Sequence, residues 1–326
     1  MLNENKMNCK NCYQDLSPYE SDGFKFCPFC GKELNGEPKE DTKPILLEKD
    51  NILVPNENLL VINAFNVDFE HVKCPAGKFL MGSPENEKGR RGNETQHEVI
   101  IDKEFYIGKY PITQTQYEAV TKCNPSYSKG PNFPVECVNW HQAKEFCHKL
   151  NEATRKTRPE GYIFDLPTEA QWEYACRANT TTSLNSGKNI TYSITSCSNL
   201  DEVGWYKANS LGKLHPVGEK KPNNWGIYDM HGNICEWCRD YYIENYISKY
   251  ADPDGLDKTA QRVYRGGNCQ CSPSNCRSAF RFHVNSFSEY QNGFRIALVK
   301  SRKLTMFYKV GEAPHEPTRF TRRHKE

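Results

Sequence analysis

The sequence predicts a mixed α+β globular fold with short strands, few helices and much irregular chain, preceded by a small metal-binding module. Apolar and polar residues alternate only over short runs, such as 59–63 and 97–101, which is typical of short strands. Three stretches pair a capping residue with an apolar helical stripe, so three helices are expected. Paired cysteines near the N-terminus predict the metal-binding module.

The composition suits a soluble globular protein. Hydrophobic residues make up 37% of the 326 residues, charged residues make up 26%, and the formal net charge is +2. This balance gives no reason to expect nucleic acid or a membrane as the main partner, and no run of about 18 apolar residues predicts a transmembrane helix. The first residues lack the apolar core of a secretory signal, so we expect a cytoplasmic protein. Most of the fifteen cysteines should then be reduced thiols, either metal ligands or small buried side chains.

Two CxxC pairs predict a zinc ribbon at residues 1–35. Cys9 and Cys12 form the first pair, and Cys27 and Cys30 form the second, with fourteen residues between the pairs. Four thiolates can close a tetrahedron around one Zn²⁺, and such a closed site is structural because it keeps no open position. The metal would supply folding free energy that so short a module lacks. A redox dithiol pair, or a set of unrelated thiols, is the alternative.

Residues 36–58 read as a solvated linker, because they are rich in charged residues and proline. A series of short strands is expected to follow. The predicted strands are 59–63, 69–72, 78–82, 97–101 and 105–110. The polar, glycine-bearing stretch 83–95 between two of them predicts an exposed loop.

Helix starts are predicted at Thr113, Asn139 and Thr168, whose side chains can accept hydrogen bonds from the first turn. Cys147 lies on the apolar stripe of the second helix and should be a core residue. Pro167 should end a strand immediately before the third helix.

Eight motifs lie in the order and spacing of one known family. They read GKFLMGS, PITQTQYEAV, VNWHQAKEFCHKLN, FDLPTEAQWEYACRA, HPVGEKKPNNWGIYDMHGNICEWCRDYY, RVYRGGN, CRSAFR and NGFRIAL. The sequence resembles the formylglycine-generating enzyme, or sulfatase-modifying factor, family over residues 69–299. The resemblance implies a single large domain, placed at residues 59–299, with a variant C-type-lectin-like fold.

A cysteine pair behind a glycine pair is the first candidate site. Gly266 and Gly267 let the chain turn sharply, and three cysteines follow within ten residues. In the resembled family two such cysteines hold Cu(I), a soft ion that prefers thiolate. There a cysteine of the substrate protein becomes a further ligand, and dioxygen oxidises it to Cα-formylglycine. The resemblance therefore implies that Cys271 and Cys276 are catalytic copper ligands.

Two departures from the family pattern leave another interpretation open. Asn268 follows the glycine pair where the authentic enzymes have serine, and Cys235 replaces an aromatic residue that helps to wall the active site. Cys276 would then be a core residue and Cys271 an ordinary loop residue. Cys269 could also compete for metal.

A second candidate site uses hard oxygen donors, which Ca²⁺ prefers. By resemblance a structural calcium site falls on Asp229, Gly232, Ile234 and Glu236. The alternative is a well-packed turn in which Asp229 accepts hydrogen bonds from backbone amides. The two histidines near these motifs, His215 and His231, have no spaced partners and should be hydrogen-bonded or solvated.

Three functions remain open at this stage, and each has a protein or peptide as substrate or ligand. The chain could oxidise a target cysteine, bind ligands through a C-terminal segment varied by a diversity-generating retroelement, or act as an inactive adaptor. The mixed residue types that suggest a varied surface are Cys269, Cys271, Phe282, His283, Val284, Ser286, Phe287 and Tyr290. Residues 300–326 carry eight Lys or Arg and three Glu, a charge of 8 − 3 = +5, and form a basic tail. A solvated end is expected there, and nucleic acid is not expected as a partner.

Overall fold

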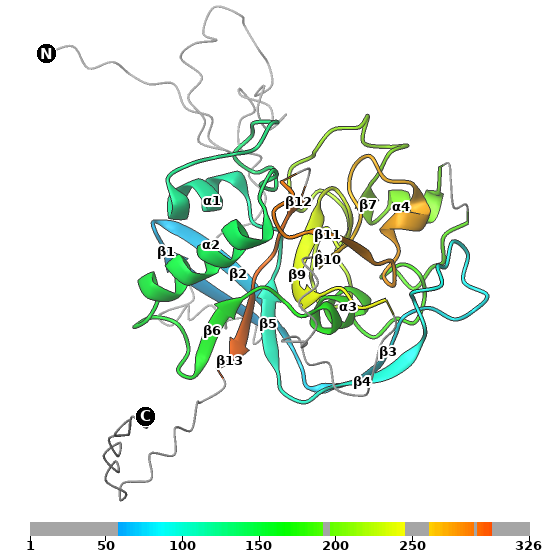
Figure 1. Cartoon of the computed structure of the whole chain (residues 1–326), viewed down its shortest axis with the longest axis horizontal. Coiled ribbons are helices and arrows are strands. Elements are labelled where there is room, and N and C mark those ends of the chain that lie inside the picture. The colour runs from blue at the N-terminus through cyan, green and yellow to red at the C-terminus, as the bar shows by residue number, and fades with distance from the viewer. Residues whose placement is uncertain (1–57, 192–195, 245–260, 290–291, 302–326) are drawn as a thin grey trace, which may run out of the picture. The chain divides into compact units, whose positions relative to one another are not determined.

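The structure, a computed structural model, describes residues 58–191, 196–244, 261–289 and 292–301 (Figure 1). The predicted zinc ribbon, the linker up to residue 57 and the tail from residue 302 lie outside the described residues. In the described ranges, no helix combines the length and apolar character needed to cross a membrane.

A five-stranded sheet forms the centre of the described fold. Its strands, in spatial order, are β1 (Leu59–Ala64), β2 (Val67–Cys74), β5 (Phe105–Gly108), β13 (Ala297–Lys300) and β6 (Tyr162–Asp165). All neighbouring strands are antiparallel. Among the described elements β13 is the last strand, and it lies between β5 and β6, so the segment that follows the cysteine loop completes the sheet.

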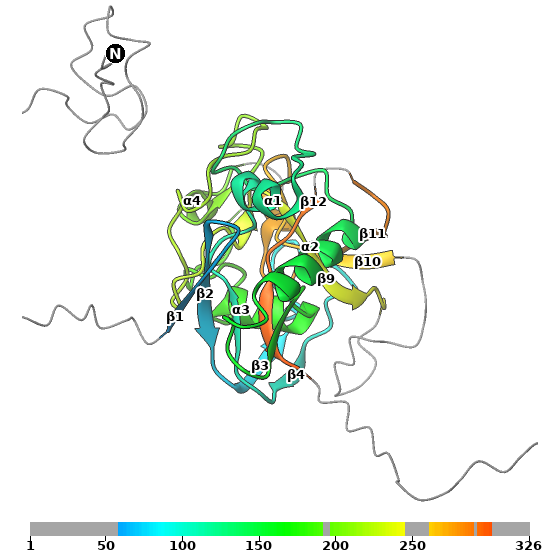
Figure 2. The same cartoon turned by 90° about the vertical axis from the view of Figure 1, so that its left-hand side faces the viewer.

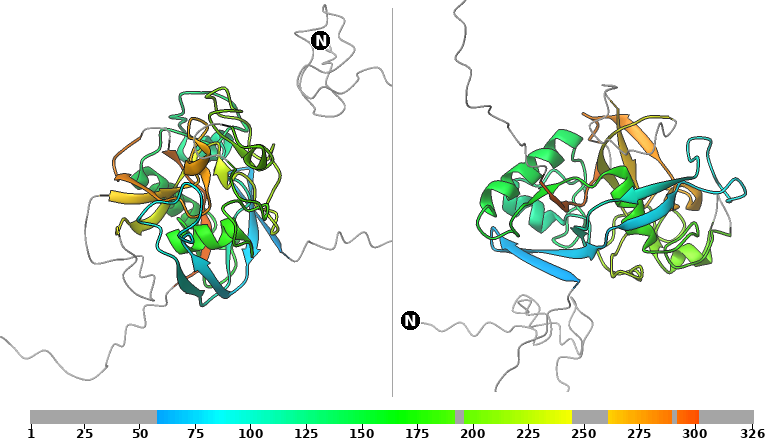
Figure 3. Two further views of the ribbon diagram at one scale, coloured as in Figure 1. Left: turned by 90° about the vertical axis from the view of Figure 1, so that its right-hand side faces the viewer. Right: turned by 90° about the horizontal axis from the view of Figure 1, so that it is seen from below.

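Apolar side chains leave this sheet on both faces, as the two-residue period of a strand requires. On one face Phe69 packs against α1 (Gln114–Thr121) and α2 (Trp140–Ala153). On the other face Val72 and Ile107 pack against the hairpin of β3 (Gly77–Met81) and β4 (His97–Ile101) and against α3 (Glu169–Arg177). Figure 2 shows β1 and β2 side by side, and the right-hand view of Figure 3 shows α1 and α2 lying over them.

A second sheet carries the candidate site. Its strands, in spatial order, are β11 (Phe282–Asn285), β10 (Gln261–Arg265), β9 (Cys235–Tyr241) and β12 (Asn292–Gly293). Smaller elements complete the described fold. They are α4 (Ser198–Asp201), the parallel pair β7 (Gly204–Trp205) and β8 (His231–Gly232), and a 3₁₀ turn, η2 (Pro273–Cys276). The arrangement confirms the expected mixed α+β class, while the finer C-type-lectin-like assignment stays a prediction.

The predicted helix starts are confirmed. Thr113, Asn139 and Thr168 are the N-caps of α1, α2 and α3, and each accepts from the third helical residue in a reciprocal capping box. Cys147 is buried in the core under α2, as expected. The exposed loop predicted at 83–95 is partly wrong, because Ser83 and Glu94 at its two ends are buried.

Candidate thiol site

The glycine pair after β10 sets the position of the cysteine loop. Gly266 and Gly267 have φ angles of +93° and +73°, which favour glycine. A Cβ on Gly267 would lie 2.8 Å from the sulfur of Cys276 and 2.6 Å from the carbonyl oxygen of Asn275. The oxygen of Gly266 accepts from the Gly232 amide at 2.8 Å. Only a residue without a side chain therefore lets Cys276 pack this closely under the turn.

Four cysteines gather around this turn. Cys235, at the start of β9, and Cys271 share a hydrogen bond between their thiols. Cys269, Cys276 and Cys235 are buried, whereas Cys271 is partly exposed. We call these four cysteines the thiol site. The structure thus brings the predicted pair Cys271 and Cys276 into one cluster and adds Cys235, the residue that departs from the family pattern.

Cys271 differs from its neighbours in acidity. Its pKa is lowered to about 7, first because it accepts the hydrogen bond of Cys235 and further because of Asn268, Asn275 and the charge of Arg91, although burial opposes this shift. Burial raises the pKa of Cys276 well above its ordinary value. A partly exposed thiol with a pKa near 7 is the reactive kind of cysteine.

His231 supports Cys276 from inside the fold. The fully buried imidazole donates from Nδ1 to the oxygen of Cys276 at 2.7 Å, and its Nε2 accepts from the Asn185 amide at 3.0 Å. Burial lowers the pKa of His231 to about 4, so the ring is neutral near pH 7. This outcome confirms the expectation of a hydrogen-bonded histidine. His215, the second histidine near the sequence motifs of the resembled family, is half-buried and stacks on Trp205 with ring centroids 3.7 Å apart.

Buried arginine–glutamate pairs hold the segment around the thiol site, and the sequence analysis missed them. Arg277, directly after Cys276, donates to Glu94 at 2.7 and 2.8 Å and to Glu87 at 2.6 Å. Arg281 donates to both oxygens of Glu169 at 2.6 and 2.8 Å. Loop 83–95 is therefore tied to the cysteine loop by a buried ion pair, which explains why its ends are not exposed. The arginines of CRSAFR and NGFR were the available signal, but no periodicity shows that an arginine is buried.

An aromatic and cationic wall borders Cys271. The guanidinium carbon of Arg91 lies 4.5 Å from the centre of the Phe280 ring, and its Nη2 donates to Asn275 at 3.4 Å. Phe282 stacks on Tyr264 with centroids 5.0 Å apart. Phe280 is fully buried, so a peptide that reached Cys271 would meet Arg91 and the partly exposed Phe282.

Three of the four predicted calcium donors already accept hydrogen bonds from protein groups. Both oxygens of Glu236 accept from Arg295 at 2.6 and 2.7 Å, and Oε2 also accepts from Trp172 at 2.7 Å. The carboxylate of Asp229 accepts from the Gly218 amide at 2.7 Å. The oxygen of Gly232 accepts from the Ile234 amide at 2.8 Å. A cation would have to displace Arg295, so this donor set does not fit Ca²⁺, and the well-packed turn describes it.

The thiol site suits a soft metal better. Among the described residues, no three His, Cys, Asp or Glu side chains lie together in a way that could hold a metal ion. Resident ligands for Cu(I) could therefore number two at most, and Cys271 and Cys276 supply soft thiols that carry no competing salt bridge to an arginine. A pair of this kind fits Cu(I) only if a further ligand arrives from outside.

The family comparison covers most of the described fold. Residues 65–300 match the family described as "Sulfatase-modifying factor enzyme 1-like domain". A *Paenibacillus barcinonensis* protein named "Chaperone protein LppX" is 31% identical over 245 residues, which cover 60% of this chain and 81% of that protein. The formylglycine-generating enzyme of *Streptomyces coelicolor* is 34% identical over 178 residues, 51% of this chain and 53% of that enzyme. The chain spans only 38% of a *Chlamydia caviae* serine/threonine-protein kinase that it also matches at 27% identity.

Two solved structures have a similar fold. "Treponema denticola variable protein 1" superposes with a TM-score of 0.64 at 27% identity, over 73% of this chain and 98% of that one. PvdO from *Pseudomonas aeruginosa* gives a TM-score of 0.60 at 27% identity, over 70% of this chain and 94% of that one. Together with the match over residues 65–300, these likenesses show that the chain belongs to the sulfatase-modifying factor enzyme 1-like family.

Proposed function

We propose that the chain oxidises a cysteine of a target protein or peptide to Cα-formylglycine, with O₂ and with Cu(I) held by Cys271 and Cys276. One observation carries this proposal. Cys271 is a partly exposed thiol with a pKa lowered to about 7, and it lies in one cluster with the buried Cys276. Resemblance to formylglycine-generating enzymes supports the reaction type.

Three of the four cysteines of the thiol site, and residues around them, have roles in this proposal. Cys271 and Cys276 would hold the metal, and when bound Cu(I) would supply the activation of dioxygen. Cys235 donates a hydrogen bond to Cys271 and so favours the thiolate that a metal needs. His231 holds the backbone of Cys276 in place. Arg91 and the partly exposed Phe282 would border the arriving peptide.

The experiment combines copper binding with turnover of a peptide that carries CxPxR. We expect the purified full chain to bind one Cu(I) and to convert the peptide cysteine to formylglycine in the presence of O₂, seen as a mass decrease. Cys271→Ser should abolish both. Cys123→Ser is the matched control, because Cys123 is an exposed cysteine beyond the end of α1 and should leave both unchanged. Copper binding and turnover that survive Cys271→Ser would refute the proposal.

Ligand binding by a varied surface is the second candidate. The likeness to the *Treponema denticola* variable protein favours it. His283 and Phe287 are exposed, as such a surface requires, and the Phe287 ring lies tilted against His141 with centroids 4.6 Å apart. Cys269 and Ser286, however, are buried, which does not suit residues selected for ligand contact. A near-copy of this segment that differs at adenines, beside a reverse transcriptase in the flanking DNA, would support this second candidate.

We propose a structural role for the N-terminal cysteines. Cys9, Cys12, Cys27 and Cys30 would hold one Zn²⁺, and the module would serve to recognise or tether a partner in the cytoplasm. Metal analysis of the full chain should find one zinc, which Cys9→Ser with Cys12→Ser removes. Zinc retained by that double variant would contradict the ribbon.

A further inference from the structure

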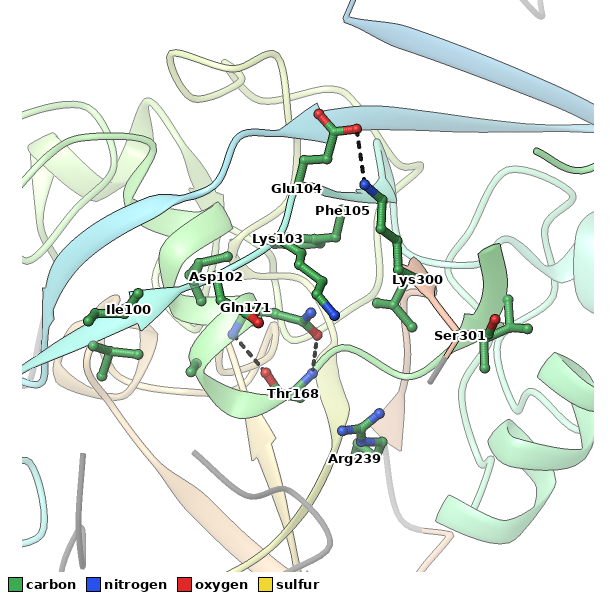
Figure 4. A pocket seen from close by; sticks show the side chains of 15 residues that line it. Ile100, Asp102, Lys103, Glu104, Phe105, Thr168, Gln171, Arg239, Lys300 and Ser301 are labelled. Carbon is green, nitrogen blue, oxygen red and sulfur yellow. Dashed lines mark hydrogen bonds and ion pairs between the residues drawn. The ribbon is translucent and has the colours of Figure 1, made fainter. Parts of the chain in front are cut away.

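A pocket of about 400 Å³ lies away from the cysteines, and none of its lining residues belongs to the thiol site (Figure 4). The turn between β4 and β5, the first turn of α3, and the ends of β9 and β13 contribute to its walls. The size is in the range of pockets that hold small molecules. The charged residues that line it decide what could bind there.

Arg239 is a pocket cation whose ion pair is long. Its side chain is 22% exposed and pairs with Asp165, with Nη1 and Oδ2 3.5 Å apart, and its charge also acts on the adjacent Asp240. Its Nε is buried and has no hydrogen-bond partner among the described residues. Asp165 is already engaged by Lys144 and by the Leu166 amide. Because Nε has no exposed surface, an anion in the pocket would contact Arg239 through its Nη atoms.

Lys103 adds a second cation to the pocket. It makes no ion pair with a described residue, whereas Lys300 lies 3.8 Å from Glu104, which also pairs with Lys73 at 3.0 Å. Figure 4 shows the Lys103 amine extending toward the first turn of α3, with Arg239 beyond it on the same side of the pocket. The amides of Thr168 and Gln171 are already used in the capping box. Recognition of an anion here would therefore come from the two side-chain cations.

The rest of the lining limits the kind of anion. Three cations and two carboxylates line the pocket, a net charge of 3 − 2 = +1. One negative charge matches this balance better than a phosphate dianion. Apolar side chains form the remainder of the walls: Val99, Ile101, Phe105, Ile163, Ala170 and Val299.

We infer that this pocket binds an organic carboxylate, with the carboxylate between Arg239 and Lys103 and the apolar part against Phe105 and Ile163. The planar fork of arginine suits the two oxygens of a carboxylate, and the ammonium group of Lys103 adds a second positive charge. The carboxylate could belong to a free acid or to the C-terminus of a peptide. This inference is independent of the proposed oxidase activity.

Calorimetry on the full chain tests the inference with two probes. One is benzoate, and the other is a short peptide that ends in phenylalanine with a free C-terminal carboxylate. We expect saturable binding of at least one probe, and the tighter one identifies the source of the carboxylate. Lys103→Glu should weaken binding by about tenfold or more, because it reverses an exposed charge without affecting the core. Arg239→Gln should weaken it at least as much.

Lys78→Glu is the matched control, because Lys78 is exposed on the neighbouring hairpin and does not line the pocket. It should change binding by no more than about twofold, as expected for a screened surface charge. Binding of neither probe, equal binding by Lys103→Glu and wild type, or tighter binding of phenyl phosphate than of benzoate would each overturn the inference.

Discussion

Within the described fold, the sequence offers two sets of metal donors: the thiol site and the turn around Glu236. The two sets differ in how exposed their side chains are and in whether a charged partner holds them. The thiol of Cys271 is partly exposed, accepts hydrogen bonds from Cys235, Asn268 and Asn275 but forms no ion pair with them, and has a lowered pKa. The carboxylate of Glu236 is fully buried and accepts three hydrogen bonds from Arg295 and Trp172. Donor type alone therefore does not define a metal site. What decides is whether a donor can be reached from solvent and is free of a buried counter-ion such as Arg295.

Glu236→Gln should have the largest effect on stability. The substitution keeps the size of the side chain but leaves the Arg295 guanidinium, which is fully buried, without its counter-charge. Breaking a buried ion pair from one side costs about 3–5 kcal/mol. Urea unfolding should show a loss of this size. A loss below about 1 kcal/mol would mean that Arg295 is compensated in another way.

Two controls separate the loss of a buried ion pair from other effects on stability. Glu98→Gln removes an exposed partner of Lys78 and should change stability by less than about 1 kcal/mol. Addition of EDTA and then of excess Ca²⁺ should leave the unfolding midpoint of the domain at residues 59–299 unchanged, because a cation would have to displace Arg295 from Glu236. A rise in that midpoint with Ca²⁺ would show that the calcium donors do assemble.

Asp229→Asn should stabilise the protein above pH 6. Burial raises the pKa of Asp229 from 3.8 to about 6, so the folded state holds the proton more tightly than the unfolded state. Its contribution to stability is fully present below pH 3.8 and is lost as the pH rises through about 6. Asparagine cannot ionise, and its side-chain oxygen can still accept from Gly218.

The gain in the free energy of unfolding should be about 1–3 kcal/mol at pH 8 and should vanish near pH 3.8. Urea midpoints of both proteins at several pH values would measure it. Equal stability at pH 8 would show that the Asp229 carboxylate is better compensated than its single amide hydrogen bond suggests. A gain that persists at low pH would point to a cause other than ionisation.

The sequence predicted the elements of the fold better than the partners of the site residues. Caps at Thr113 and Asn139 and the alternating strands are local patterns, so they can be read from a few neighbouring residues. Arg277 and Glu94 are 183 residues apart, and their buried pair depends on how loop 83–95 folds back over the cysteine loop. No local pattern encodes such a contact.

The same limit applies inside the candidate site. Motif resemblance singled out Cys271 and Cys276, and it also marked Cys235 as a departure from the family pattern. That departure gave no sign of the hydrogen bond between Cys235 and Cys271, because the two cysteines come from different strands and loops. Resemblance likewise gave the calcium positions but not the bidentate Arg295 that occupies Glu236.

Cys235→Ala tests Cys271, the partly exposed donor of the two sites. This substitution should have the smallest effect on stability. Removal of the thiol that donates to Cys271 should move the pKa of Cys271 upward from about 7. If the pKa rises by about one unit, the thiolate fraction at pH 7 and the rate of alkylation by iodoacetamide fall by about fivefold. Mass spectrometry of the Cys271 peptide over a range of pH would give the midpoint directly.

Cys269→Ala is the matched control for this last test, because Cys269 is a buried cysteine of the same cluster whose thiol is not among the groups that lower the pKa of Cys271. In the Cys269→Ala protein, the midpoint for alkylation of Cys271 should stay near pH 7 within a few tenths of a unit, because the thiol that is removed is neutral. An unchanged midpoint in Cys235→Ala would assign the acidity of Cys271 to Asn268, Asn275 and Arg91 instead. In that case the cysteine that departs from the family pattern would be a packing residue, and the thiol site would depend on its loop alone.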